Sequence, residues 1–96
     1  MPTYVVLYKF SDEGAKKIKD TVERAREARA ENDRRGFKTH GLYWTQGQYD
    51  LVAIVEAPDE QSMMAGLCNI NGAGNVHSET LRAFDEAEME AIIQRM

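Results

Sequence analysis

The sequence has little cysteine and no long hydrophobic run. Cys68 is the single cysteine among 96 residues, which excludes a disulfide framework within the chain and favours a reducing compartment. No apolar stretch approaches the ~20 residues that a membrane-spanning helix requires. The first residues, Met-Pro-Thr-Tyr-Val-Val-Leu-Tyr, lack the basic region and the cleavage site of a signal peptide. We therefore predict a cytoplasmic protein without a membrane segment.

The chain also lacks the basic excess of nucleic-acid-binding proteins. It carries 12 Lys and Arg against 16 Asp and Glu, a net charge of −4, whereas binding to a phosphate backbone requires a positive surface. The basic residues gather between Lys16 and Arg35, where acidic residues are interleaved with them. This pattern is typical of a solvated helix face, so we expect no nucleic-acid partner.

Metal-binding and nucleophilic side chains are scarce. His40 and His77 are the only histidines, and Glu79, two residues after His77, is the one ligand with suitable strand spacing. Two such ligands make a weak metal candidate, so we expect neither a metal nor another cofactor. Cys68 lies on an apolar helix face without a cationic neighbour, which predicts a small buried hydrophobe instead of a reactive thiol.

Two segments have apolar residues on both strand faces. In Thr3–Phe10, Tyr4, Val6 and Tyr8 face one way and Val5 and Leu7 the other, and residues 49–56 repeat the pattern. A strand that is apolar on both sides is covered on both sides. Because a chain of this length forms one modest core, its helices can cover only one side. We therefore predict a homodimer or a higher homo-oligomer.

The remaining segments complete the order β-α-β-β-α-β-α. The predicted elements are a helix from Asp12 to about Arg34 with an apolar stripe of Ile18, Val22, Ala25 and Ala28, strands at 38–45 and 49–56 joined by a hairpin, a helix capped by Asp59, a strand at 76–84, and a final helix with a capping-box-like Asp85 and Glu88. This order predicts one α+β domain over residues 1–96. Its fold is ferredoxin-like, with an antiparallel four-stranded sheet, central first and third strands and an added C-terminal helix.

The densest set of polar and aromatic residues surrounds the hairpin. Tyr43, Trp44, Tyr49 and Asp50 lie there, with His40 upstream. One interpretation is a ligand pocket with aromatic walls, in which Asp50, Tyr49 or His40 transfers a proton. The other is structural: Tyr43 and Trp44 fill the core and the subunit interface, and Asp50 accepts hydrogen bonds from backbone amides at the turn.

The segment Tyr43-Trp44-Thr45-x-Gly47-x-Tyr49-Asp50-x-Val52-Ala53-Ile54-Val55-Glu56-Ala57-Pro58-Asp59 resembles the signature of the GYD-domain family. The opening Met1–Leu7 and the segment from Gly74 to Phe84 resemble it as well. The family differs from this chain in having an aliphatic residue where Gln46 stands, often Arg at Gln48, and a basic or hydroxyl residue at His77.

This resemblance implies a dimeric α/β-barrel arrangement, in which two ferredoxin-like sheets pack face to face. It transfers no catalytic residue. Three functions stay open: a self-assembling domain that binds a small molecule between sheet and helices, a cofactor-independent enzyme with monooxygenase- or isomerase-like chemistry, and a regulatory or interaction module.

Overall fold

The computed structural model describes residues 1–96. Its elements are β1 (Thr3–Phe10), α1 (Asp12–Lys16), a 3-10 turn (Ile18–Asp20), α2 (Thr21–Arg34), β2 (Lys38–Trp44), β3 (Leu51–Glu56), α3 (Glu60–Gly72), β4 (Val76–Ala83) and α4 (Glu86–Gln94). No helix is both long and apolar enough to cross a bilayer.

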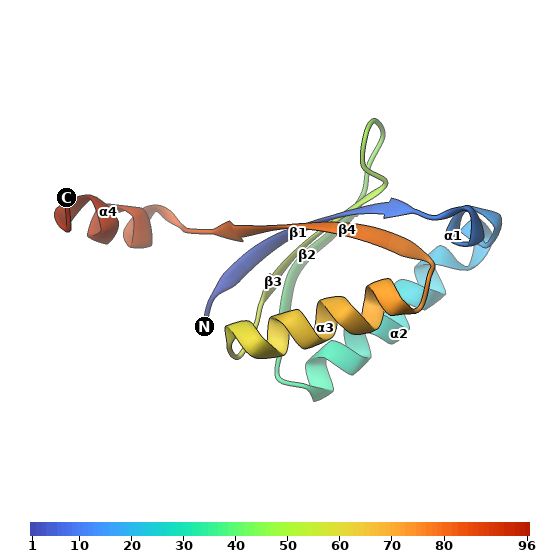
Figure 1. The fold of residues 1–96 in the computed structure, drawn as a ribbon, viewed down its shortest axis with the longest axis horizontal. Helices are drawn as coiled ribbons and strands as arrows, with labels where there is room; N and C mark the ends of the chain where they lie inside the picture. Colours follow the sequence, from blue (N-terminus) through green and yellow to red (C-terminus); the bar gives the residue numbers. More distant parts are fainter.

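The four strands form one antiparallel sheet in the order β2-β3-β1-β4. The two strands predicted to be central, β1 and β3, are central. Helices α2 and α3 lie on the same face of the sheet, and no helix covers the other face (Figure 1). The predicted α+β, ferredoxin-like fold is therefore confirmed.

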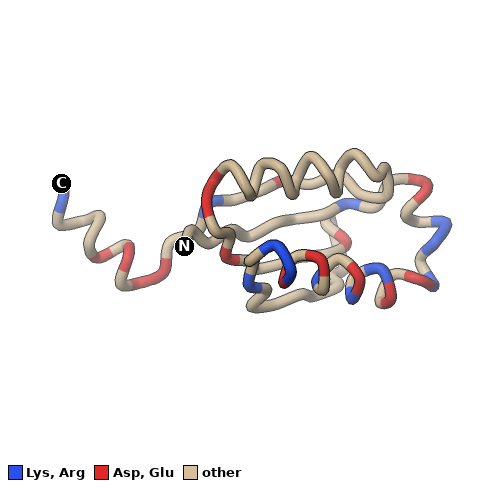
Figure 2. The backbone as a smooth tube through the Cα atoms, turned by 90° about the horizontal axis from the view of Figure 1, so that it is seen from below, with Lys and Arg blue, Asp and Glu red and all other residues tan.

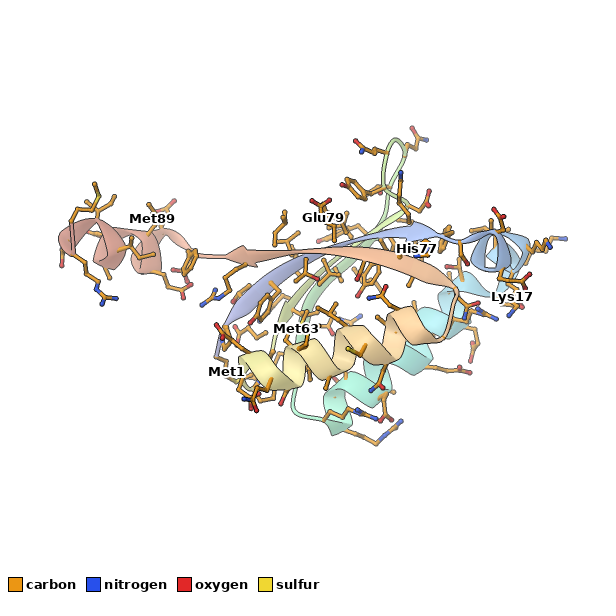
Figure 3. All side chains as sticks on the ribbon, viewed as in Figure 1. Met1, Lys17, Met63, His77, Glu79 and Met89 are labelled. Atoms are coloured by element: carbon orange, nitrogen blue, oxygen red, sulfur yellow. The ribbon has the colours of Figure 1, made fainter.

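The core lies between the sheet and its two helices. Val6 on β1 is completely buried, and Ala53 and Val55 on β3 point to the same side. Met63 of α3 packs onto them from below the sheet (Figure 3). Phe37, which follows α2, belongs to the same buried cluster. Alternate residues of each strand face this core, which leaves Val5, Leu7, Val52 and Ile54 on the uncovered face.

The long helix predicted from Asp12 to Arg34 is interrupted. Ser11 caps α1 by accepting from the Gly14 amide, and its own amide donates to the Asn75 carbonyl at 3.0 Å. These bonds hold α1 at the start of β4, whereas α2 runs back under the sheet. The chain turns between them through the 3-10 turn, and Ile18 and Val22 are left exposed.

The last two helices begin at the capping residues that the sequence predicted. Asp59 caps α3 by accepting from the Ser62 amide, which lowers the pKa of that carboxyl. Asp85 and Glu88 form the predicted capping box at α4. Cys68 is exposed, so the prediction of a buried thiol is wrong: it lies on the solvent side of α3, whereas Met63 faces the core.

Helix α4 lies apart from the rest of the chain. It follows β4 and extends beyond the edge of the body (Figure 1), and none of its residues is buried. Met89 and Ile93 are exposed on it, and Met96 is exposed just beyond its end. A helix of nine residues is marginal alone in water, and the chain itself buries none of the residues of α4.

Candidate functional site

Asp50 joins the hairpin to the end of the central strand β1. Its carboxylate accepts a hydrogen bond from the Phe10 amide at 2.8 Å, and its own amide donates to the Tyr8 carbonyl. The Thr45 amide in turn donates to the Asp50 carbonyl, which closes the base of the loop. The carboxylate thus replaces a backbone acceptor where β1 and β3 separate. This is the kind of contact expected from the structural interpretation, although it is made with β1 and not with the turn.

Tyr49 reaches across the uncovered face of the sheet. Its hydroxyl donates to the carboxylate of Glu79 on β4, and β1 lies between the two strands concerned. This hydrogen bond, followed by burial and the negative charge of Glu79, raises the pKa of Tyr49. The phenol is therefore a neutral donor at physiological pH, and it fixes the hairpin against the sheet.

The other predicted site residues point in different directions. Trp44 donates from its indole nitrogen to the Thr21 hydroxyl at 3.0 Å, which ties β2 to the start of α2. Tyr43 lies on the opposite face and is 59% exposed. His40 occupies a β-bulge between Thr39 and Gly41 and contacts the Glu56 carboxylate at 2.9 Å.

The structure therefore does not gather these five side chains around one pocket. Neither of the two main cavities is lined by Tyr43, Trp44, Tyr49, Asp50 or His40. Tyr43 is 59% and Trp44 41% exposed in the single chain, so neither belongs to its buried core. The proton-transfer and ligand-binding roles assigned to the five residues stay predictions.

His77 and Glu79 lie on the uncovered face of the edge strand β4. His77 is paired with Lys9 of β1, a cationic neighbour, and Glu79 is occupied by Tyr49. Figure 3 shows Glu79 on the side of the sheet away from the helices. His40 is on the opposite edge strand. No three His, Cys, Asp or Glu side chains are arranged to hold a metal.

A cavity that the hairpin residues do not touch lies on the helix side. It has a volume of about 440 Å³ and separates α2 from the sheet. Ala25 and Ala28 of α2 face Ala53 of β3 across it. These methyl groups are too small to fill the space between helix and sheet. The sequence indicated this unfilled space, because two positions of the predicted apolar stripe that line the cavity are alanines, Ala25 and Ala28.

The uncovered face of the sheet carries an apolar patch, which we call the open-face patch: Val5, Leu7, Tyr43, Val52, Ile54 and Leu81. The register places Val5 between Ile54 and Leu81, and Leu7 beside Val52. Charged residues border it at both ends, with Lys9 and His77 at one end and Glu56 with Lys38 at the other. An apolar centre with a polar rim is the usual anatomy of a protein interface.

Comparison with known proteins gives this architecture a family. The family model of the GYD domain matches residues 4–93. A Thermus thermophilus protein named glutamine synthetase and cystathionine beta-lyase binding protein is 33% identical over 92 residues, which cover 95% of this chain and 97% of that protein. No solved structure matches. Since the family model covers nearly the whole chain, the resemblance seen in the sequence is confirmed, and the chain belongs to the GYD domain family.

Proposed function

We propose that this chain is a protein-interaction domain that works as a homo-oligomer. Two copies pair through the open-face patch, and helix α4 binds a partner enzyme. The observation that carries the proposal is the patch itself: two central strands are apolar on the face that the chain leaves uncovered.

The exposed area supports binding to another molecule through the open-face patch, the protruding α4 (Figure 1) or both. The chain exposes 6748 Å², whereas a compact monomer of 10.9 kDa exposes roughly 5,600 Å². The excess of more than about 1,000 Å² is comparable to the ~800 Å² that each partner buries in a standard interface. The radius of gyration, 14.4 Å, also exceeds the ~12.5 Å of a compact chain of this length.

The charges around the patch are compatible with a second copy as its occupant. In a symmetric pair the same patch meets itself, and each residue contacts its counterpart's neighbours. When two such faces stack in opposite directions, the Lys9 end of one copy lies over the Glu56 end of the other. Each Lys9 then faces an end where the charge of Glu56 is offset by Lys38, so no net like charge opposes it, while Leu7 and Val52 meet in the middle.

Helix α4 has the pattern of a helix that binds in a groove. Met89, Ile92 and Ile93, with Met96 two residues past the end of the helix, follow the i, i+3, i+4, i+7 spacing of such anchors. Glu86, Glu88 and Glu90 make its flanks acidic, so the complementary surface is an apolar groove with a basic rim. Figure 2 shows these acidic positions on the protruding segment. The Thermus relative is named for binding two enzymes, and an enzyme is the kind of partner we assign to α4.

The enzyme-binding part is tested with glutamine synthetase and cystathionine beta-lyase from the organism that supplies this chain. Each purified enzyme is titrated against the wild-type protein and two variants by biolayer interferometry. Ile93→Asp places a charge among the anchors of α4, and Ala91→Asp places the same charge on the opposite side of the helix. We expect at least one enzyme to bind, and Ile93→Asp to weaken that binding more than about tenfold.

Ala91→Asp is expected to bind as the wild type does. If neither enzyme binds, or if both variants behave alike, α4 is not the recognition element. A lower solution mass of Ile93→Asp in the absence of enzyme would instead assign α4 to the contact between copies.

A further inference from the structure

The helix-side cavity is part of a longer hollow under the two helices. A second cavity, of about 660 Å³, lies between α2, α3 and the sheet, and it shares Tyr8, Asn32 and Val55 with the first. Both volumes fall within the range of roughly 300–1,000 Å³ typical of small-molecule sites. Protein interiors are normally filled to crystal-like density. A hollow of this size beside the core is therefore a candidate site for a small molecule.

The walls of the first cavity include one buried polar group that the chain does not satisfy. The Thr39 hydroxyl is buried and has no hydrogen-bond partner, although most buried polar groups in proteins have one. Tyr8 lines both cavities, and burial raises the pKa of its phenol to about 12. Tyr8 is therefore a neutral donor at the boundary between them. These two hydroxyls come from strands on either side of β3.

The charge around the first cavity is positive. Lys17, Arg24 and Arg29 line it against the single acid Glu27. Arg24 is half-buried and forms no ion pair within the chain. A partly desolvated guanidinium without a carboxylate partner is well suited to bind one from a ligand. The neighbouring surface of α3 carries almost no charge (Figure 2), so the positive side of the hollow is the α2 side.

From these observations we infer that the cavity under α2 binds a small amphipathic carboxylate. Its apolar body lies against Ala25, Ala28 and Ala53, its carboxylate pairs with Arg24, and the Thr39 hydroxyl donates the hydrogen bond that the chain leaves unmade. A ligand between sheet and helices is part of one of the three functions that the sequence left open, and the inference gives it a place and a chemical class. The inference does not depend on the open-face patch or on α4.

The test uses a panel of probes that share an apolar body and differ in charge. Octanoate and phenylacetate are compared with octanamide and phenylacetamide by isothermal titration calorimetry on the full-length protein. Trp44, the only tryptophan, is bonded to the cavity-lining Thr21, so its fluorescence gives a second readout. We expect a carboxylate to bind about tenfold more tightly than its amide, a difference of about 1.4 kcal/mol.

Matched variants assign the binding to the cavity. Arg24→Met should reduce carboxylate affinity to that of the amide, whereas Arg26→Met, on an exposed arginine paired with Glu23, should change nothing. Thr39→Val should weaken binding of the acid without lowering the melting temperature of the free protein. Ala28→Leu should fill the cavity, abolish binding and raise the melting temperature, and Ala25→Val provides the same test if Ala28→Leu does not fold.

Three results would overturn the inference: no carboxylate of the panel binds at millimolar concentration, acid and amide bind equally, or Arg24→Met and Arg26→Met have the same affinity. Solution mass is recorded for every variant. If no carboxylate binds but the oligomer is unchanged, the cavity inference fails and the proposed interaction function is unaffected. If the oligomer is lost but carboxylate binding is intact, the proposed self-assembly fails and the cavity inference is unaffected.

Discussion

The two faces of the sheet are built from alternating residues of the same strands, yet the chain covers only one of them. Tyr4, Val6 and Val55 face the helices and are buried. Val5, Leu7 and Ile54, their direct neighbours, remain partly exposed. The first set is explained by the fold of a single chain. The second set has an apolar composition that the single chain does not use, and the proposed pairing of two copies would account for it.

The two helices that cover the sheet, α2 and α3, also differ in how far their residues are buried. Figure 2 shows charges spread along α2 and almost none on α3, although both lie over the same face of the sheet. α3 contributes Met63 to the core, whereas no residue of α2 is buried. α2 therefore rests on small side chains above a cavity instead of filling it. Burial on the helix side is sufficient for the fold and leaves room for a ligand.

The largest expected effect comes from placing a charge on the covered face. Val6 has no exposed surface, so Val6→Asp buries an unpaired carboxylate and should cost more than about 4 kcal/mol. We expect circular dichroism to show an unfolded chain. Leu7→Asp, one residue along on the open face, should keep the native spectrum. If both variants unfold, the open face is as essential to the single chain as the core.

The next effect tests the close contact between α1 and β4. A Cβ at Gly14 would lie 2.0 Å from the Asn75 carbonyl oxygen, and relieving such overpacking should cost about 2–3 kcal/mol in Gly14→Ala. Gly72→Ala is the control, because a Cβ there meets no atom within 4 Å. That variant should gain about 0.4–1 kcal/mol through the unfolded state. Urea denaturation measures both, and equal free energies of unfolding would contradict the packing described for Gly14.

A smaller effect is expected at alkaline pH. Burial raises the pKa of Tyr8 to about 12, above the ~10 of an unfolded tyrosine. Between these values the unfolded chain loses the proton first, so the free energy of unfolding is fully retained below pH ~10 and falls as the pH rises toward 12. We expect a loss on the order of 2 kcal/mol across this window, and Tyr8→Phe should remove most of it.

Tyr49 gives the open-face counterpart of that titration. Glu79→Gln removes the charged acceptor, so the pKa of Tyr49 should return toward its ordinary value in an ultraviolet absorbance titration. An unchanged titration would mean that the Tyr49–Glu79 bond does not form in solution.

The smallest effect separates the two adjacent aromatics of β2. Trp44→Phe loses the hydrogen bond to Thr21 and should cost about 0.5–1 kcal/mol. Tyr43→Phe, on the opposite face, is measured in the Leu7→Asp variant, which we expect to be monomeric. There it should leave the free energy of unfolding unchanged. A larger loss from Tyr43→Phe than from Trp44→Phe would reverse the assignment of the two faces.

Much of the fold was predictable because it depends on local patterns. The two doubly apolar strands identified β1 and β3 as central, and Asp59 and Asp85 marked the helix starts where the structure has them. The break between α1 and α2 was missed because it depends on contacts of Ser11 and Gly14 with Asn75, far away in the sequence. Cys68 was misplaced because neighbouring apolar residues suggested a buried face that α3 presents through Met63 instead.

The candidate sites were less predictable. The hairpin residues drew attention by composition, but register sends Tyr43 and Trp44 to opposite faces and ties Asp50 to β1. The cavity arises from what Ala25, Ala28 and Ala53 do not fill, and its Thr39 hydroxyl is unpartnered only because of the surrounding packing. A single sequence carries no direct signal for empty space.

The central claim is that a second copy covers the open-face patch, and sedimentation equilibrium at micromolar concentration tests it most directly. Wild-type protein, Leu7→Asp and the control Ala30→Asp, with the same added charge on the exposed surface of α2, are compared. We predict a dimer or larger assembly for the wild type and the control, and a folded monomer for Leu7→Asp. A monomeric wild type, or an unchanged mass for Leu7→Asp, would contradict the account.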